Sequence, residues 1–238
     1  MRQVIVTGGG TGIGRAIAAA FRSAGDSVTI TGRRVDVLER AAKELGATAV
    51  PFDATDPDAV AAALDELPER VDVLVNNAGG NTDLDRPDPE NLAELAADWR
   101  ANFSANVLSA VLVTAALASR LADNARIVTI GSIAARFGAG SYGAAKAAIE
   151  AWTATAATEF GPRGITANVV APGLVLDTEF FRGRLDDAGI KQRVDATRNK
   201  RAGRVDDVAA TVRFLASAEA GHITGQVIHL NGGAYLGR

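Results

Sequence analysis

Thr7-Gly8-Gly9-Gly10-Thr11-Gly12-Ile13-Gly14 decides the fold, because it joins the apolar run Val4-Ile5-Val6 to an alanine-rich segment with helical spacing. In such a turn Gly8 permits the tight bend, Gly12 lets the backbone approach a pyrophosphate, and Gly14 allows the helix to pack closely on the strand. The helix N-terminus adds N–H groups and a positive potential. A plain glycine-rich turn is the alternative, but the order strand, loop, helix predicts a dinucleotide site. We expect its contacts to come from Gly8, Thr11, Gly12, Ile13 and Gly14.

Short apolar, β-branched runs alternate with alanine- and leucine-rich helical segments along the rest of the chain. The expected strands are 4–7, 27–31, 48–52, 71–75, 126–130, 165–170 and 226–230, and the expected helices are 13–24, 34–45, 57–67, 91–121, 142–160 and 205–217. Continuous apolar strands separated by helices predict βαβ units with right-handed crossovers. The sequence therefore predicts the α/β class, as one Rossmann-fold domain over residues 1–238 with a doubly wound, seven-stranded parallel sheet and helices on both faces. The polar segment 177–204 lies outside this pattern and is expected to be a substrate lid; it is called the lid below.

The composition excludes several kinds of chemistry. The chain has 238 residues, 47% hydrophobic and 22% charged, with no Cys, two His and a net charge of −3. Without Cys there are no disulfides, thiolate metal sites or cysteine nucleophiles, and the scarcity of His argues against a Ser-His-Asp hydrolase or a metal site. Only three apolar residues follow Met1-Arg2-Gln3, too few for a signal peptide or a membrane span. We therefore expect a cytoplasmic protein with no membrane or nucleic-acid partner.

Two arginines, Arg33 and Arg34, follow the second expected strand. Dinucleotide-binding folds usually carry an acidic residue near this point to hold the adenosine ribose hydroxyls. Guanidinium groups instead suit a 2′-phosphate, so NADP(H) is favoured over NAD(H), with Arg15 as a possible reinforcement. The alternative is a solvated turn at the start of a helix.

Further motifs follow the glycine loop in order along the chain: Asn76-Asn77-Ala78-Gly79, Ser132, Tyr142-Gly143-Ala144-Ala145-Lys146 and Pro172-Gly173. Together with the glycine loop they resemble the short-chain dehydrogenase/reductase family over nearly the whole chain. The C-terminal stretch, with Ile223-Thr224-Gly225-Gln226 and Asn231-Gly232-Gly233, further resembles the β-ketoacyl-carrier-protein reductase branch.

Tyr142 and Lys146 lie four residues apart and so share one face of a helix. A neighbouring ammonium and the cationic oxidised nicotinamide both favour the phenolate, so we expect them to lower the Tyr142 pKa and Tyr142 to exchange protons with substrate. Ser132 follows a strand, where its hydroxyl can hold a carbonyl oxygen. The resemblance implies that Lys146 also bonds the nicotinamide ribose, and that Asn106 holds a water in a proton relay, with Asn102 as its rival.

The resemblance implies further cofactor contacts at strand ends: Asp53 and Ala54, Asn77 and Gly79, and Val175 and Thr178, in addition to Tyr142 and Lys146. Asp53 is expected at the adenine, although it could simply begin a turn. Asn77 and Gly79 could instead only tie down the sheet. Val175 would offer backbone groups to the nicotinamide carboxamide, and Thr178 its hydroxyl.

The chain departs from the branch it resembles in the loop 133–141, which is about three residues shorter and lines the expected substrate pocket. Residues 182–204 carry eight basic and three acidic side chains, a net charge of +5 that could steer an acidic acyl carrier protein or could be a solvated surface. Phe180 and Phe181 are expected either to wall the pocket or to anchor the lid.

The resulting hypothesis is an NADPH-dependent reductase that acts on a small carbonyl or alcohol substrate, with a 3-oxoacyl thioester as one candidate. Two rivals remain: an enzyme that runs as an NAD(P)+-dependent alcohol dehydrogenase, and a non-catalytic NADP(H)-sensing protein. The resemblance also implies a homotetramer, to which the long alanine-rich helices are suited.

Overall fold

The computed structural model describes residues 1–237, apart from the side chain of Asp85. Within that part of the chain, strands form one parallel sheet in the order β3-β2-β1-β4-β5-β6-β7. The strands are β1 (Gln3–Thr7), β2 (Ser27–Gly32), β3 (Thr48–Pro51), β4 (Val71–Asn76), β5 (Leu121–Ile130), β6 (Thr166–Pro172) and β7 (Val227–Leu230). The predicted α/β class, with a seven-stranded parallel sheet of Rossmann type, is confirmed.

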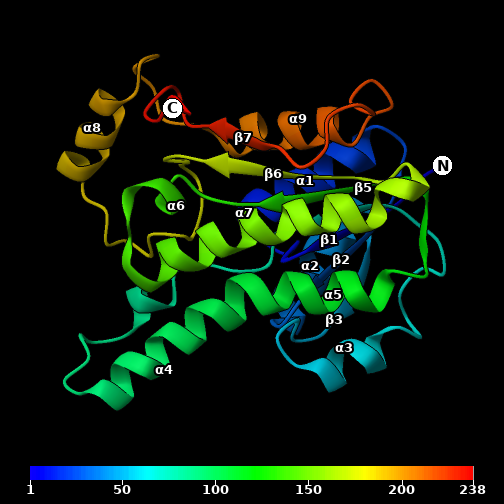
Figure 1. Cartoon of the computed structure of the whole chain (residues 1–238), viewed down its shortest axis with the longest axis horizontal. Coiled ribbons are helices and arrows are strands. Elements are labelled where there is room, and N and C mark those ends of the chain that lie inside the picture. The colour runs from blue at the N-terminus through cyan, green and yellow to red at the C-terminus, as the bar shows by residue number, and fades with distance from the viewer. Residues whose placement is uncertain (238) are drawn as a thin grey trace.

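Helices cover both faces of the sheet (Figure 1). One face carries α1 (Gly12–Ser23), α2 (Val35–Leu45) and α9 (Val205–Leu215). The other carries α3 (Pro57–Ala63), α5 (Ser109–Leu117) and α7 (Gly140–Phe160). The shorter or peripheral elements are η1 (Thr82–Asp85), α4 (Leu92–Phe103), the π-helical η2 (Ser104–Leu108), α6 (Ala134–Phe137), η3 (Gly161–Arg163) and α8 (Asp187–Ala196).

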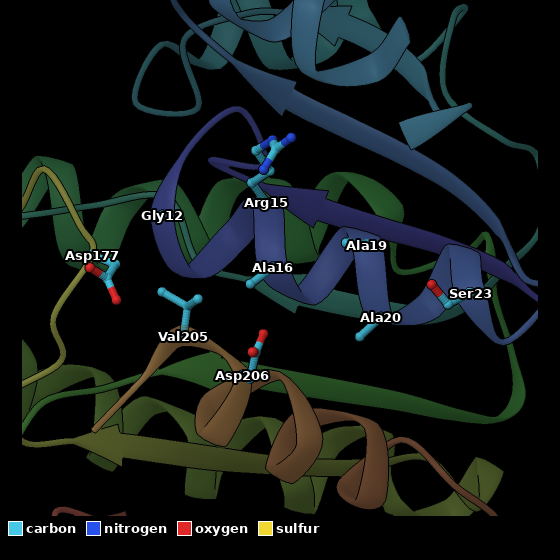
Figure 2. A pocket seen from close by; sticks show the side chains of 9 residues that line it. All are labelled: Gly12, Arg15, Ala16, Ala19, Ala20, Ser23, Asp177, Val205 and Asp206. Carbon is cyan, nitrogen blue, oxygen red and sulfur yellow. The ribbon is translucent and has the colours of Figure 1, made fainter. Parts of the chain in front are cut away.

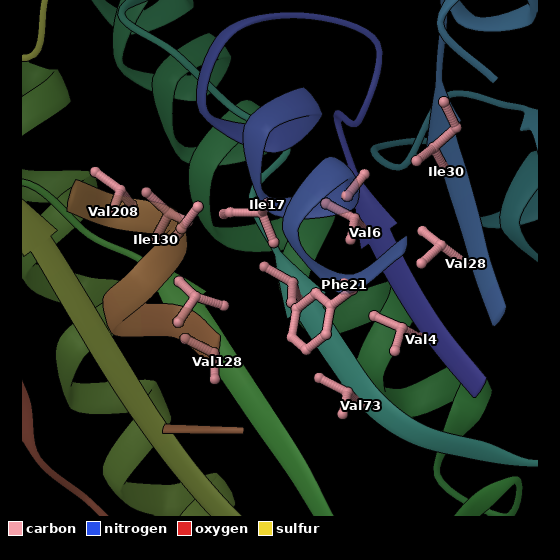
Figure 3. Close-up of a cluster of buried hydrophobic side chains, with 14 of the residues drawn as sticks. Val4, Val6, Ile17, Phe21, Val28, Ile30, Val73, Val128, Ile130 and Val208 are labelled. Carbon is pink, nitrogen blue, oxygen red and sulfur yellow. The ribbon is translucent and has the colours of Figure 1, made fainter. Parts of the chain in front are cut away.

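Alternation along β1 divides its side chains between two cores. Val4 and Val6 point to the core under α1, α2 and α9, whereas Ile5 points to the opposite core. All three are fully buried, as expected for a strand covered on both sides. Figure 3 shows the first core, where Ile17 and Phe21 of α1 pack onto valines and isoleucines of neighbouring strands. This packing fixes α1, and with it the glycine loop, against the sheet.

The helix expected over 91–121 contains a π-helical turn and is shorter than predicted. The chain runs from α4 through the π-helical η2 to α5, and it has turned into β5 by Leu121 rather than by Arg126. The β4–β5 pairing is irregular there, because Val71 pairs with Leu121 but Val73 already pairs with Arg126. The hydrophobic pattern of 121–125 therefore belongs to a bulged strand, which helical periodicity alone could not distinguish.

The lid contains a helix, α8, that its weak periodicity did not predict. None of the residues of α8 is buried, so no apolar face marks it in the sequence. Asp186 caps this helix by accepting a hydrogen bond from the Gly189 amide at 2.8 Å. A local capping contact thus defines where the helix starts.

Among the described residues, the continuous helical run Leu92–Leu117 is long and apolar enough to cross a membrane, and 39% of its apolar window is buried. Core helices of globular proteins meet the same criteria, so length and composition are weak evidence here. The expectation of no membrane partner stays a prediction.

The carboxyl ends of β1 and β4 mark the point where the chain switches between faces of the sheet. After β1 it enters α1 on one face, and after β4 it continues towards α4 and α5 on the other. In open α/β sheets, ligands bind outside the carboxyl ends of the strands at such a switch point.

Candidate active site

The glycine loop bends as the sequence predicts. Gly8 and Gly12 have φ of +64° and +51°, in the left-handed region that favours glycine. A Cβ added to Gly14 would lie 2.2 Å from the Gly8 carbonyl oxygen and 2.5 Å from Asn77 Nδ2. Thr11 makes no side-chain capping bond to the first turn of α1, and that turn contains no acidic residue. The loop therefore presents an uncapped, electropositive helix N-terminus to an anion.

Asn77 ties the end of β4 to this loop. Its side-chain Nδ2 donates to the carbonyl oxygens of Thr7 and Gly8 at 2.9 and 3.0 Å, and its backbone N–H donates to Thr7 Oγ1 at 3.0 Å. Gly79, with φ +144°, lies so close to Asn106 that an added Cβ would be 2.6 Å from Asn106 Oδ1. Asn77 thus holds the two loops together, Gly79 leaves no room for a side chain, and direct contact of either residue with a cofactor stays a prediction.

The two arginines after β2 face carboxylates. Arg33 Nη1 lies 3.7 Å from Asp53 Oδ2, and Arg34 Nη2 lies 2.9 Å from Glu179 Oε2 in the lid. Asp53 also accepts hydrogen bonds from the amide and hydroxyl of Thr55, so it begins a turn as the alternative interpretation allowed. These hydrogen bonds and Arg33 keep the Asp53 pKa below its usual value despite partial desolvation. Arg15 instead pairs with Glu44 on α2 at 2.7 Å.

Ser132, Tyr142 and Lys146 come together at the carboxyl end of β5. Tyr142 and Lys146 lie on one face of α7, with Lys146 Nζ 5.8 Å from the centre of the Tyr142 ring. Ser132, just beyond β5, hydrogen-bonds the Tyr142 phenol. Lys146 Nζ donates to the Ile130 carbonyl oxygen at 2.8 Å. The structure thus gathers a phenol, a hydroxyl and an amine around one point.

The structure shows no lowering of the Tyr142 pKa by Lys146, and burial acts in the opposite direction. Tyr142 is only 6% exposed, and this burial raises its pKa to about 12, more than the Ser132 hydrogen bond lowers it. Lys146 is 5% exposed, and burial lowers its own pKa to about 8. Burial disfavours the charged form of each group, so at neutral pH Tyr142 is a protonated phenol beside a largely protonated amine.

Asn106 lies in the π-helical turn η2, fully packed against the loop after β4. Its Oδ1 accepts from the Gly80 amide at 3.0 Å and its Nδ2 donates to the Gly80 carbonyl at 2.9 Å. Single π-turns inside helices are frequent at functional sites. The side chain of the rival Asn102 belongs to a different network, described below. The water-holding role expected of Asn106 stays a prediction.

The lid begins against both the loop and the tyrosine. Thr178 Cβ and Cγ2 lie 3.6 Å from the position of a Cβ on Gly12, and the Phe180 ring lies 5.7 Å from the Tyr142 ring. Val175, two residues before the lid, forms an isolated bridge with Gly203 near the end of the lid. Phe181 stacks edge-on to Phe180 and lies under Arg193. The phenylalanines therefore both border the tyrosine and anchor the lid.

A network beside Tyr142 was not predicted from the sequence. Asn102 Nδ2 donates to Asp83 Oδ1 and Ser141 Oγ at 2.7 and 2.8 Å, and Ser141 donates to Asp83 at 2.9 Å. It joins η1 and α4 to the residue preceding Tyr142. These contacts join residues 19 to 58 positions apart, so they leave no local pattern in the sequence. The one hint was that Asn102 had been considered as the alternative to Asn106.

A second unpredicted contact joins the short loop 133–141 to α7. Arg136 pairs with Glu150, one helical turn beyond Lys146. Burial raises the Glu150 pKa, and Arg136 opposes this effect. The ion pair thereby fastens the loop expected to line the substrate pocket.

A hollow of about 410 Å³ lies beside the glycine loop, between α1 and α9 (Figure 2). It is bordered mainly by small side chains of α1, with Arg15, Asp177 and Asp206 at its polar margin. Its lining includes neither Tyr142 nor Lys146, so it is separate from the proposed catalytic groups. No cluster of potential metal-binding side chains occurs among the described residues.

Comparisons with known proteins agree with this geometry. Residues 8–235 match the family described as "Enoyl-(Acyl carrier protein) reductase". The 3-oxoacyl-[acyl-carrier-protein] reductase FabG of Escherichia coli K12 is 36% identical, with 98% of this chain and 96% of the relative covered.

Solved structures match along the whole chain. A short-chain dehydrogenase/reductase of Brucella melitensis superimposes with a TM-score of 0.88 at 29% identity, covering 99% of this chain and 97% of its own. BdcA in complex with NADPH gives 0.85 at 33% identity, covering 97% of this chain and 93% of its own.

Proposed function

Because this chain belongs to the short-chain dehydrogenase/reductase family and is thus an NAD(P)-dependent oxidoreductase acting on CH–OH and C=O groups, we propose that it reduces a ketone with NADPH. Tyr142 acts as the general acid in this proposal. The observation that carries it is the geometry of the site: a buried phenol hydrogen-bonded by Ser132, with Lys146 Nζ 5.8 Å from the centre of its ring. Burial also raises the Tyr142 pKa, which keeps the phenol protonated. A group that must give a proton to a developing alkoxide has to hold that proton at neutral pH.

The residues of the loop fit a dinucleotide phosphate. Gly8 and Gly12 adopt backbone angles that leave the turn open, and a side chain at Gly14 would clash with it. The uncapped start of α1 supplies N–H donors and a positive potential to the same space. Arg33 and Arg34 lie at the end of β2, where an adenosine ribose would be read, and their guanidinium groups suit a 2′-phosphate. This set supports NADP(H) over NAD(H).

When bound, the reduced nicotinamide supplies the hydride for the carbonyl carbon. Ser132 holds the carbonyl oxygen, and Tyr142 delivers its proton to that oxygen. Lys146 bonds the cofactor ribose and places a positive charge near the tyrosinate that is left, which stabilises it. Asn106 keeps the π-turn and the loop at Gly80 in place, so that a water can connect Lys146 with solvent.

Phe180 excludes water from the reacting atoms. Its ring borders Tyr142, and the tyrosine is almost fully buried under it. A dry site strengthens the hydrogen bonds that position the carbonyl oxygen. The same burial requires the lid to move when substrate enters, as lids of many enzymes do.

The finer proposal is a 3-oxoacyl thioester as substrate. Support comes from the FabG relative, whose name gives that activity, and from the net charge of +5 over residues 182–204. An acidic carrier would be drawn to that surface. Some of this charge is already used internally, since Lys191 pairs with Asp195 and Arg201 with Asp207.

Tyr142→Phe tests the proposal, with Tyr235→Phe as its control because Tyr235 is the only other tyrosine in the sequence. NADPH oxidation is followed at the nicotinamide absorbance band with a panel of ketones and 3-oxoacyl thioesters. We expect Tyr142→Phe to reduce turnover by at least about a hundredfold while NADPH binding persists, since general acid catalysis contributes that much or more. Tyr235→Phe should retain turnover. Full activity of Tyr142→Phe would remove the acid role.

A further inference from the structure

Three consecutive residues at the start of the lid contact three different parts of the proposed site. Thr178 lies over Gly12 of the phosphate loop, Glu179 pairs with Arg34 at the end of β2, and Phe180 packs beside Tyr142. The first and third contacts are uncharged. The middle one places a carboxylate of the lid on an arginine proposed to read the cofactor.

The Glu179–Arg34 contact joins segments 145 residues apart. Arg34 Nη2 donates to Glu179 Oε2 at 2.9 Å and also lies 3.4 Å from Thr11 Oγ1 of the glycine loop. Arg34 is therefore held between the lid and the loop, at the edge where phosphates are proposed to bind. Nη2 has two hydrogens, one for each contact, so a phosphate that binds this nitrogen displaces either Thr11 or Glu179. The Glu179 carboxylate carries the same sign of charge as the phosphate and is the partner that competes with it.

Charge and exposure decide which partner Arg34 keeps. The side chains of Arg34 and Glu179 are 58% and 64% exposed. Ion pairs this exposed are weak, worth about a 1.5- to fivefold change in an equilibrium constant. A 2′-phosphate carries up to two charges and presents more acceptor oxygens than a carboxylate, so it can bind a guanidinium through paired hydrogen bonds. A cofactor without that phosphate has nothing comparable to offer Arg34.

We propose that Glu179 is a specificity-determining residue that competes with the cofactor 2′-phosphate for Arg34. With NAD(H) the pair stays closed, and with NADP(H) the phosphate takes Arg34 and frees the start of the lid. Occupation of the phosphate site is thereby linked to release of the segment that covers Tyr142. This inference rests on the proposed function, since it takes Arg34 as the reader of the phosphate.

Glu179→Gln removes the charge and keeps the size of the side chain. The control is Asp187→Asn, which changes the charge of the lid by the same amount at the first residue of α8. Dissociation constants for NADPH and NADH are measured by nicotinamide fluorescence. We expect Glu179→Gln to lower the dissociation constant for NADPH by about two- to fivefold and to leave that for NADH unchanged, because only the 2′-phosphate competes with Glu179. Asp187→Asn should alter neither cofactor in this way.

Arg34→Ala separates the two proposals. If Arg34→Ala weakens the binding of NADPH but not of NADH, while Glu179→Gln changes the binding of neither, the proposed competition is wrong and the cofactor proposal stands. If Arg34→Ala affects both cofactors equally or neither, the assignment of Arg34 as the phosphate reader is wrong, and the inference falls with it. Equal tightening of both cofactors by Glu179→Gln, or tightening by Asp187→Asn as well, also overturns the competition.

Hydrogen exchange provides a readout independent of turnover. Adenosine 2′,5′-bisphosphate carries the 2′-phosphate without a nicotinamide, and 5′-ADP lacks the 2′-phosphate. We expect the bisphosphate, but not 5′-ADP, to speed amide exchange in residues 177–186. In Glu179→Gln this segment should exchange fast already and not respond. Unchanged or slower exchange with the bisphosphate contradicts the release of the lid.

Discussion

Substituting Gly14 with alanine should disable both the packing of α1 and the cofactor loop. The added Cβ would lie 2.2 Å from the Gly8 carbonyl oxygen, 1.2 Å short of the 3.4 Å at which ordinary contact begins. Its neighbours cannot yield easily, because the atom it meets is backbone and α1 is anchored through Ile17 and Phe21. Overpacking of this kind lowers the free energy of unfolding by about 1–3 kcal/mol, and the higher helix propensity of alanine offsets about 1 kcal/mol of that loss.

Gly10→Ala is the matched control in the same loop. A Cβ there meets Val37 Cγ1 at 3.4 Å, which is ordinary contact. We expect Gly10→Ala to stay within about 0.5 kcal/mol of the parent protein. Gly14→Ala should lose up to about 2 kcal/mol in urea denaturation and at least about tenfold in NADPH affinity, because the loop must shift to make room. Equal stability and equal affinity of the two variants would refute this explanation of Gly14.

Three further predictions concern buried charge and the surface. Burial lowers the Lys146 pKa to about 8, so charging Lys146 costs the folded state at most about 3 kcal/mol below pH 8, and this cost fades as pH rises towards 10.5. Lys146→Met should therefore be more stable than the parent at pH 7, and this difference should be about 2 kcal/mol smaller at pH 9.5. A difference that does not change with pH would contradict this explanation. Arg136→Ala leaves Glu150 without its cation and raises the Glu150 pKa further. Relative to the parent, stability should therefore fall as pH rises above the usual carboxyl range, and adding Glu150→Gln should abolish that fall, as followed by thermal unfolding. Leu92 and Trp99 of α4 are 83% and 43% exposed, so replacing both with lysine should dissociate the proposed homotetramer in sedimentation velocity; a parent protein that is monomeric at micromolar concentration would exclude the tetramer.

Local and periodic features of the sequence predicted the fold well. The strand–loop–helix pattern around Gly8 and Gly14 requires a specific backbone path, and the structure has it. Alternating apolar strands and helices predicted the parallel sheet, because burial on both faces leaves a continuous apolar run. The boundary predicted between helix and strand in residues 117–126 was wrong, because a bulged strand and the end of a helix can have the same apolar composition.

Within the proposed catalytic trio, the spacing of Tyr142 and Lys146 has a geometric meaning, whereas Ser132 was placed by its position after a strand and by the family resemblance. Residues four apart on a helix share a face, so Tyr142 and Lys146 could be paired without a structure. Their electrostatics could not be predicted, because the direction of each pKa shift depends on how deeply the lid and the sheet bury them. The pairs Arg34–Glu179 and Arg136–Glu150 were also missed, since they join segments that only the fold brings together.

The transfer of a labelled hydride tests the central claim most directly. The protein is incubated with NADPH carrying deuterium on the transferable position of the nicotinamide, together with a panel of 3-oxoacyl thioesters and simple ketones, and the products are analysed by mass spectrometry. We predict an alcohol with one deuterium on the former carbonyl carbon, formed in equal amount to NADP+ by the parent protein and not by Tyr142→Phe. A bound cofactor that never transfers its deuterium to any carbonyl in the panel would contradict the proposed reductase and favour a cofactor-sensing role.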